Sequence, residues 1–205
     1  GELETALGMP KNLLNAHIMG CEAWSALERG LVDPVGFAAR YDAEVKAGIA
    51  TGSIHPLLER VTGEKIISTI NAGDGHPRAC YVEAISALRR RGVKCAALTN
   101  NFQAAGSVQK TDPGVAAMVG TIADLFDVVV ESSVVGLRKP DPRIYTLVCE
   151  RCGVLPTDCV FLDDIGANLK PAAKMGIKTI RVRGSDEDGV DALLELEGVI
   201  GGEPL

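Results

Sequence analysis

The sequence predicts an α/β protein in which an α-helical subdomain precedes a parallel β-sheet. After Gly92, short apolar runs alternate with helical segments, which is the order of βαβ units. Before residue 79 we find no strand-like run, and apolar residues recur at helical spacing. One apolar run ends at two adjacent carboxylates, Asp163 and Asp164, as expected at the carboxyl edge of a parallel sheet.

The N-terminal part is expected to form three helical stretches. The apolar spacing places them at residues 13–27, 34–46 and 55–61. The turn-rich segment 71–77 then serves as a hinge. We therefore assign residues 1–78 to an α-helical cap subdomain.

The second part is expected to form the α/β core, over residues 79–198. The expected strands are residues 93–98, 126–130, 159–162 and 178–182, and the expected helices are residues 80–91, 113–125, 142–152, 167–175 and 187–197. Gly92, Gly153 and Gly176 each separate a helix from a strand, so we expect them to end helices in the left-handed conformation. Residues 199–205 form a flexible Gly-rich tail.

Composition and charge narrow the functional class. The 205 residues are 46% hydrophobic and 23% charged, with a net charge of −6. This balance indicates a soluble globule that is a poor general binder of nucleic acid or anionic membrane. No apolar stretch approaches the ~20 residues of a membrane span, and the N-terminus does not read as a signal peptide. Cys95 and Cys159 lie in strand-like runs, which indicates reduced thiols and a cytoplasmic location.

Two polar motifs at strand and helix ends suggest phosphate binding. Thr99 and Asn100 directly follow an apolar strand, where a hydroxyl, an amide and backbone N–H groups can bind an oxyanion. The alternative is an ordinary polar turn. Lys139 precedes Pro140 and a helix that Asp141 is expected to cap. Its charge can neutralise a phosphate, or it can be a solvated loop cation.

A third motif, after the next strand, suggests a cation site. Adjacent acids at a strand end repel each other unless a cation or a donor compensates them. Asp164 and Asn168 can both reach one hard cation such as Mg2+. The alternative is that an Asp caps the following helix. Cys149 and Cys152 have the spacing of a redox or zinc pair, but with no second pair they are expected to be core or surface thiols.

The order of these three motifs resembles the haloacid dehalogenase (HAD) superfamily, and the resemblance covers about residues 1–200. The run from Phe161 to Ala172, FLDDIGANLKPA, is similar to the N-terminal phosphatase-type domain of soluble epoxide hydrolases. It is also similar to the related domain of acyl-CoA dehydrogenase family proteins. The segment from Trp24 to Gly30 resembles the helical cap of that subgroup.

The resemblance implies a Rossmann-like core with an α-helical cap inserted near the N-terminus. It also implies Mg2+-dependent hydrolysis of a small-molecule phosphate ester through a phospho-aspartyl intermediate. In that mechanism Thr99 would bind the phosphoryl oxygens with Asn100 beside it, and Lys139 would steady the nucleophile and the phosphate.

The resemblance likewise assigns the metal site. Asp164 would be the metal ligand, and Asn168 stands where many relatives carry a second Asp. Asp163 stands where many relatives carry Gly, so it receives a supporting role.

The family's first motif, an apolar strand ending in Asp-x-Asp, is not found ahead of the cap. The one Asp-x-Asp, at residues 186–188, is expected in a surface turn that caps a helix. In the family that strand lies centrally, between the strands ending at Leu98 and Leu162. We therefore expect the first core strand to be missing and the chain to be part of a longer protein.

Two functions remain open. The first is a phosphatase that lacks its nucleophile in this chain, and the second is a catalytically inactive HAD-like module for binding or docking. A dehalogenase is disfavoured, because the superfamily's dehalogenases need no metal. The sequence indicates neither the substrate nor the oligomeric state.

Overall fold

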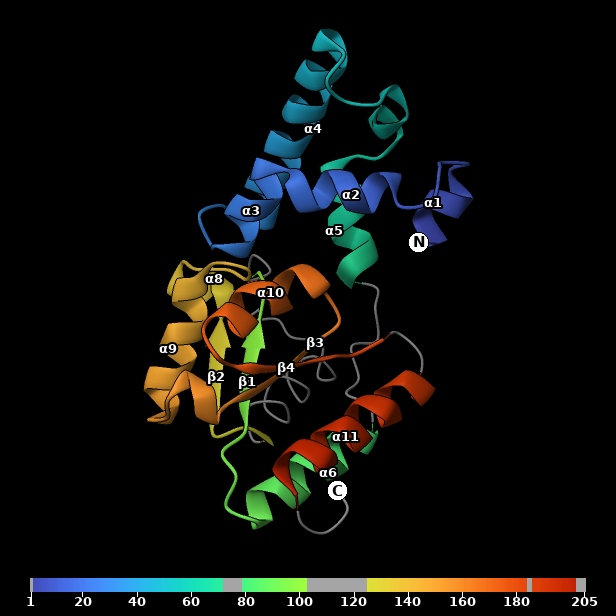
Figure 1. The fold of residues 1–205 in the computed structure, drawn as a ribbon. Helices are drawn as coiled ribbons and strands as arrows, with labels where there is room; N and C mark the ends of the chain where they lie inside the picture. Colours follow the sequence, from blue (N-terminus) through green and yellow to red (C-terminus); the bar gives the residue numbers. More distant parts are fainter. Residues whose placement is uncertain (1, 72–78, 103–124, 184–185, 202–205) are drawn as a thin grey trace. The chain divides into compact units, whose positions relative to one another are not determined.

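The computed structural model describes residues 2–71, 79–102, 125–183 and 186–201 (Figure 1). The chain divides into two compact units. Unit 1 comprises Gly1–Asp74, Asn100–Lys110 and Ser132–Gly136, and unit 2 comprises Gly75–Thr99, Thr111–Glu131 and Leu137–Leu205. Besides the first 74 residues, unit 1 therefore takes in two short segments from the part of the chain expected to form the core.

Within its described residues, the regular structure of unit 1 is helical. The elements are α1 (Glu2–Ala6), α2 (Leu13–Gly20), α3 (Glu22–Glu28), α4 (Pro34–Thr51), the 3-10 helix η1 (Pro56–Arg60), α5 (Gly63–Asn71) and α8 (Ser132–Val135). The expected stretch 13–27 is thus two helices. Cys21 between them has an extended backbone, and the Glu44 carboxylate accepts hydrogen bonds from the backbone N–H groups of Glu22 and Ala23. This cap reaches across the fold, so the helical spacing of the sequence does not reveal it.

Helix α4 is longer than the expected 34–46, for local reasons at both ends. The Asp33 side chain accepts a hydrogen bond from the Gly36 N–H at 2.7 Å, which caps the first turn. The helix continues to Thr51 and ends at Gly52, whose φ is 74°. Every third or fourth residue from Phe37 onward is buried against the unit's core, which is the pattern of an amphipathic helix.

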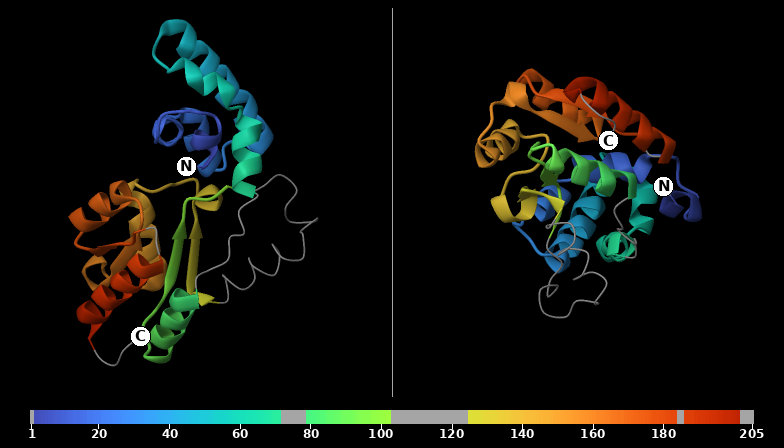
Figure 2. Two further views of the ribbon diagram at one scale, coloured as in Figure 1. Left: turned by 90° about the vertical axis from the view of Figure 1, so that its right-hand side faces the viewer. Right: turned by 90° about the horizontal axis from the view of Figure 1, so that it is seen from below.

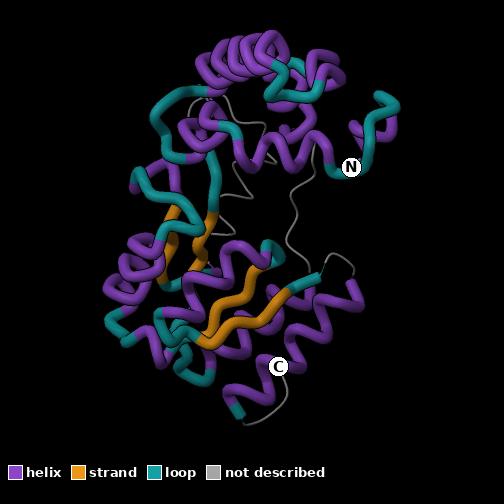
Figure 3. The backbone as a smooth tube through the Cα atoms, turned by 45° about the horizontal axis from the view of Figure 1, so that its top comes forward, coloured by secondary structure: helices purple, strands orange, loops and turns teal. Residues whose placement is uncertain are grey.

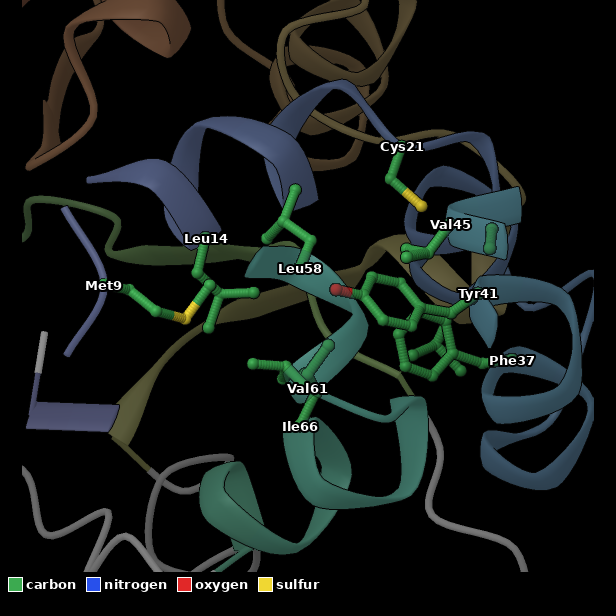
Figure 4. Packing of buried hydrophobic residues seen from close by; sticks show 11 residues of the cluster. Met9, Leu14, Cys21, Phe37, Tyr41, Val45, Leu58, Val61 and Ile66 are labelled. Carbon is green, nitrogen blue, oxygen red and sulfur yellow. The ribbon is translucent and has the colours of Figure 1, made fainter. Parts of the chain in front are cut away.

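The core of unit 1 is aromatic at its centre. The rings of Phe37 and Tyr41 lie 5.7 Å apart, and Figure 4 shows them beside Leu58 and Val61. Trp24 meets the Phe37 ring edge-on, with 5.6 Å between the ring centroids. Trp24 is therefore a packing residue of unit 1.

Helix α5 follows η1 and was not expected from the sequence, whereas the expected helix 55–61 is the short η1. The N–H of Gly63, at the start of α5, donates to the Asp42 carboxylate at 2.8 Å. A Cβ added at Gly63 would lie 2.5 Å from the Ala38 Cα. The absence of a side chain at Gly63 thus lets α5 start directly against α4.

Unit 2 alternates strands and helices, as expected. Its elements are α6 (Ala79–Arg90), β1 (Ala96–Thr99), β2 (Val128–Glu131), α9 (Pro142–Cys152), the 3-10 helix η2 (Pro156–Asp158), β3 (Val160–Asp163), α10 (Gly166–Lys174), β4 (Lys178–Arg181) and α11 (Asp186–Ile200). The expected helix 113–125 and hinge 71–77 lie largely outside the described residues.

The strands pair as two separate two-stranded parallel sheets, β1 with β2 and β3 with β4 (Figure 3). Leu98 pairs with Val130, and Leu162 with Ile180. Strand β1 begins later than the expected residue 93. Just ahead of it, the Cys95 N–H donates to the Asp127 carboxylate at 2.9 Å. In the described part of the chain, β1 and β3 are not hydrogen-bonded to each other.

Helices cover these sheets within unit 2. Helices α6 and α11 lie side by side (Figures 1 and 2), and α9 packs against β1 and β2. Side chains of α6, α11 and β4, among them Leu88, Leu196 and Ile180, share one buried core. Gly92, Gly153 and Gly176 have φ values of 79°, 68° and 90°, which confirms the expected left-handed turns after three helices. No helix among the described residues is long and apolar enough to cross a membrane.

Candidate active site

A buried ion pair lies where the strands of unit 2 end. The Lys139 ammonium donates to the Asp163 carboxylate at 2.8 Å and to the Leu98 carbonyl at 2.8 Å. The two side chains are only 11% and 4% exposed. Leu98 is near the end of β1 and Asp163 is the last residue of β3. One ammonium therefore joins the carboxyl ends of strands from two separate sheets.

The Asp163 carboxylate has a full set of donors. Its Oδ1 accepts from the Ile165 N–H at 2.8 Å and from the Asn168 side-chain amide at 3.0 Å. The same amide lies 3.2 Å from Oδ2, which also accepts from Lys139. A buried carboxylate needs such compensation. Three groups thus hold the Asp163 carboxylate in place at the carboxyl end of β3.

Two aromatic side chains contact the residues of this site. The Tyr145 hydroxyl donates to the Asn168 backbone carbonyl at 2.7 Å. Burial raises the pKa of Tyr145, and the Asp163 charge raises it further, so the hydroxyl remains a donor. The Phe161 ring lies 5.5 Å from the Tyr145 ring, and its centroid lies 5.6 Å from the Lys139 ammonium, within the range of a cation–π contact.

The approach to helix α9 is built as the sequence predicts. Asp141 caps the helix by accepting from the Arg143 N–H at 3.0 Å, and Pro142 occupies the first turn. This cap and the proline set the start of the helix at Pro142, three residues after Lys139. The alternative of a solvated loop cation is wrong for Lys139, because its side chain is buried.

Thr99, the last residue of β1, has an unused hydroxyl. Its Oγ1 is buried and has no hydrogen-bond partner within the described ranges. Buried hydroxyls are normally paired, so an unpaired one at a strand end is suited to a ligand oxygen. Asn100 follows Thr99 directly but belongs to the segment grouped with unit 1, so the structure does not place its side chain relative to the residues of unit 2.

Asp164 and Asn168 are the residues assigned to a metal. Asp164 is exposed, and its carboxylate makes no hydrogen bond in the described parts of the chain. The Asn168 amide nitrogen is turned to Asp163, which leaves its amide oxygen for other contacts. No cluster of three or more His, Cys, Asp or Glu side chains suited to a metal occurs among the described residues. These donors fit Mg2+, which often takes one or two carboxylates and completes its shell with water and phosphate.

The structure adds detail on two residues of this site. Asp163, for which the resemblance implies a supporting role, is the carboxylate that Lys139, Asn168 and the Ile165 N–H all contact. Tyr145 was not singled out, because an aromatic residue on a helix usually signals packing alone. The residues of the Asp186–Asp188 motif begin helix α11, and their side chains lie outside the described part of the structure.

Comparison with known proteins gives a consistent family assignment. A family model described as haloacid dehalogenase-like hydrolase matches residues 59–176. The chain is 40% identical over 119 residues to acyl-CoA dehydrogenase family member 10 of Mus musculus, across 58% of this chain and 10% of that protein. It is 41% identical over 120 residues to bifunctional epoxide hydrolase 2 of Rattus norvegicus, across 58% of this chain and 20% of that protein.

A phosphatase of Mycobacterium tuberculosis is 36% identical over 121 residues, across 57% of this chain and 52% of that protein. The matched segment therefore spans between about a tenth and half of the length of these relatives.

Solved structures share the fold. A HAD-like family hydrolase from Porphyromonas gingivalis aligns with a TM-score of 0.59 at 20% identity, covering 85% of this chain and 78% of that one. A HAD family enzyme from Bacteroides thetaiotaomicron in complex with magnesium aligns with a TM-score of 0.55 at 20% identity, covering 82% and 79%. At this identity the likeness establishes the fold.

Proposed function

Because the chain belongs to the haloacid dehalogenase-like hydrolase family, we propose that it forms most of a Mg2+-dependent phosphatase site for a small phosphate monoester. The observation that carries the proposal is the Lys139 ammonium, buried against Asp163 at the carboxyl ends of β1 and β3. Ligands of open α/β sheets bind at that edge. The likeness to a mycobacterial phosphatase supports the choice of substrate class.

Lys139 and Thr99 would bind the phosphoryl group. Both reach the carboxyl end of β1, Lys139 through its hydrogen bond to the Leu98 carbonyl and Thr99 as the last strand residue. The buried ammonium would neutralise phosphate charge where little water screens it. The unpaired Thr99 hydroxyl would donate to a phosphoryl oxygen.

Asp164 would hold the magnesium ion, with Asn168 contributing its amide oxygen. Asp163 would position the other two residues, because its oxygens already accept from Lys139, Asn168 and the Ile165 N–H. When bound, Mg2+ would supply charge neutralisation at the phosphoryl oxygens. This residue assignment gives Asp163 and Asp164 separate roles: Asp163 orders the site and Asp164 faces the ligand.

The attacking carboxylate is the remaining requirement of a phospho-aspartyl mechanism. The single Asp-x-Asp of the sequence lies at the start of helix α11, whereas this chemistry needs an Asp at a strand end beside Lys139. We propose that a further strand, not among these 205 residues, inserts between β1 and β3 and supplies that Asp. Two features support this: β1 and β3 belong to different sheets, and Lys139 joins their ends.

A second candidate function is a catalytically inactive HAD-like module that binds phosphate without hydrolysing it. The same sequence observation favours it, since no other Asp-x-Asp exists in the chain. For either function we propose a reducing, cytoplasmic location, because all six cysteines are free thiols.

One experiment separates the two functions. The chain is expressed as given and also with an added N-terminal strand that ends in Asp-x-Asp, and both proteins are assayed with 4-nitrophenyl phosphate with and without Mg2+. A phosphatase predicts Mg2+-dependent turnover in the extended protein only. Asp164→Ala and Thr99→Val should each lower that turnover by about 100-fold or more, while the exposed Asp191→Asn on α11 leaves it unchanged.

Calorimetry on the chain as given tests the binding module. Inorganic phosphate with Mg2+ should bind, and Thr99→Val should weaken that binding. If the extended protein does not turn over but phosphate still binds, the inactive module is the correct function. If the extended protein turns over equally well with Asp164→Ala, the proposed metal site is wrong.

A further inference from the structure

Three cysteines gather in unit 2, away from the residues of the phosphate site. Cys149 and Cys152 lie in the last turns of α9, and Cys159 lies between η2 and β3. The Cys149 and Cys159 sulfurs are 3.8 Å apart. All three residues are free thiols.

The chain reversal between α9 and β3 brings these sulfurs together. Helix α9 ends at Gly153, whose φ of 68° lets the chain turn back at once. The Val154 N–H returns to the Cys149 carbonyl at 3.1 Å, and the Cys159 N–H donates to the Pro156 carbonyl at 3.1 Å. These hydrogen bonds fix both sides of a short loop, so the approach of the two thiols is built into the backbone.

The two thiols differ in access to solvent. The Cys149 residue is 5% exposed, whereas Cys159 is half-buried. A soluble oxidant therefore reaches the Cys159 sulfur before the Cys149 sulfur. Cys149 is the neighbouring thiol, which reacts second. Cys152 is also buried, at 7% exposure. The arrangement is that of an attacking thiol and a resolving thiol.

We propose that Cys149 and Cys159 form an oxidative modification site, at which a small-molecule disulfide such as oxidised glutathione converts the two thiols to an intramolecular disulfide. The Cys159 thiolate attacks a glutathione sulfur, which forms a mixed disulfide and releases one glutathione thiolate. The Cys149 thiolate then attacks the Cys159 sulfur and releases the second. Two protein thiols are oxidised, one glutathione disulfide is reduced to two thiols, and the two thiol protons pass to the two glutathione thiolates.

The sulfurs must close from 3.8 Å to the bonded distance of about 2.0 Å. Side-chain rotation of the two cysteines, one at the end of a helix and one in a loop, can supply a movement of this size. The new bond would join the end of α9 to the start of β3. Lys139 lies shortly before α9, and Asp163 is the last residue of β3. Oxidation would therefore link the two elements that flank the buried ion pair of the phosphate site.

The surroundings of Cys159 make this reaction slow at neutral pH. Burial, the hydrogen bond with the Cys149 thiol and the nearby Cys149, Cys152 and Asp158 groups together raise the pKa of Cys159 to about 12. Lys94 donates to the Cys152 carbonyl at 2.7 Å, and its charge acts to lower the pKa of Cys152. Since only the thiolate attacks, the rate should rise about tenfold for each pH unit well below the pKa of Cys159.

The test uses the full chain with oxidised glutathione at pH 8.5, followed by alkylation of remaining thiols and peptide mass spectrometry. Trypsin cuts after Arg151, and a protease that cuts before Asp158 separates Cys152 from Cys159. We expect a peptide pair linked through Cys149 and Cys159, lighter by the two thiol hydrogens. The rate of its formation should be about tenfold lower at pH 7.5.

Variants and a control thiol complete the test. Cys149→Ser should stop the reaction at a mixed disulfide on Cys159, whereas Cys152→Ser and the distant Cys80→Ser should leave the linked peptide unchanged. Peptide mapping of the unsubstituted chain does not depend on whether a variant folds. A disulfide that links Cys149 to Cys152, or a Cys159 that stays reduced while Cys80 becomes glutathionylated, would overturn the proposal.

Discussion

Replacing Asp163 with Asn tests how strongly the buried ion pair supports the fold. The substitution keeps the size of the side chain but removes the charge that faces the Lys139 ammonium at 2.8 Å. It also sets an amide nitrogen against the Asn168 amide, which now donates to both carboxylate oxygens. Lys139 would retain the Leu98 carbonyl as an acceptor but would lose the Asp163 charge.

The magnitude follows from the burial of the pair. Both side chains are nearly excluded from solvent, and removing one partner of a buried pair costs about 3–5 kcal/mol. For a protein of this size each kcal/mol lowers the melting temperature by roughly 2–4 °C. We therefore expect Asp163→Asn to lower the melting temperature of unit 2 by about 6–20 °C.

The assay combines thermal and urea unfolding followed by far-UV circular dichroism. Fluorescence of Trp24, the single tryptophan, reports on unit 1 in the same samples. Asp164→Asn is the matched control, because this neighbouring carboxylate is exposed and such surface changes stay within about 0.5 kcal/mol. Adding Lys139→Met to Asp163→Asn should recover at least about 1 kcal/mol, since the buried ammonium that faced the lost carboxylate is then removed as well.

Equal effects of Asp163→Asn and Asp164→Asn would refute the reasoning. So would a double variant less stable than Asp163→Asn alone. Either result would mean that the ammonium finds another counter-charge or reaches water when Asp163 is neutral.

Three further substitutions have defined outcomes. Gly63→Ala should destabilise unit 1 by about 1–3 kcal/mol, seen in the urea midpoint of tryptophan fluorescence, because the new methyl would lie 2.5 Å from the Ala38 Cα. Tyr145→Phe leaves the Asn168 carbonyl without its hydroxyl donor and should cost about 1–3 kcal/mol by calorimetry. Asp127→Asn should reduce the fall in urea midpoint below pH 3.8, the ordinary pKa of an Asp, because hydrogen bonding from the backbone and an arginine lowers the Asp127 pKa.

The sign of the pH effect follows from linkage. A carboxyl whose pKa is lowered by folding adds stability above its ordinary pKa, and this stability is lost as the pH falls through the lowered value. Asp164→Asn is the control for that series. Gly20→Ala is the control for Gly63→Ala, since a Cβ at Gly20 meets nothing within 4 Å. Should Gly20→Ala destabilise as much as Gly63→Ala, close helix packing is not the cause.

Local sequence signals predicted much of unit 2. The four strands and the helices α6, α9, α10 and α11 follow from apolar runs, helical spacing and glycine stops, which depend on neighbouring residues alone. Strand ends were less well predicted. The Asp127 carboxylate accepts a hydrogen bond from the Cys95 N–H, just ahead of β1. This contact joins residues that are 32 apart in the sequence.

Contacts between distant residues decided what local patterns could not. Helices α2 and α3 separate at Cys21 because Glu44, on another helix, caps the second of them. Helix α5 went unpredicted, since its start depends on the approach to α4 that Gly63 permits. Such contacts leave no periodic signal in the chain.

The sequence by itself determined the family, the order of the elements and the residue types at the strand ends, because each rests on short motifs. Only the tertiary structure decided which of the two adjacent acids is buried and which is exposed. Asp163 points to Lys139 and is neutralised there, whereas Asp164 stays exposed. The physical reason is that successive side chains at a strand end face opposite ways, and only the packed fold shows which direction holds the buried ammonium.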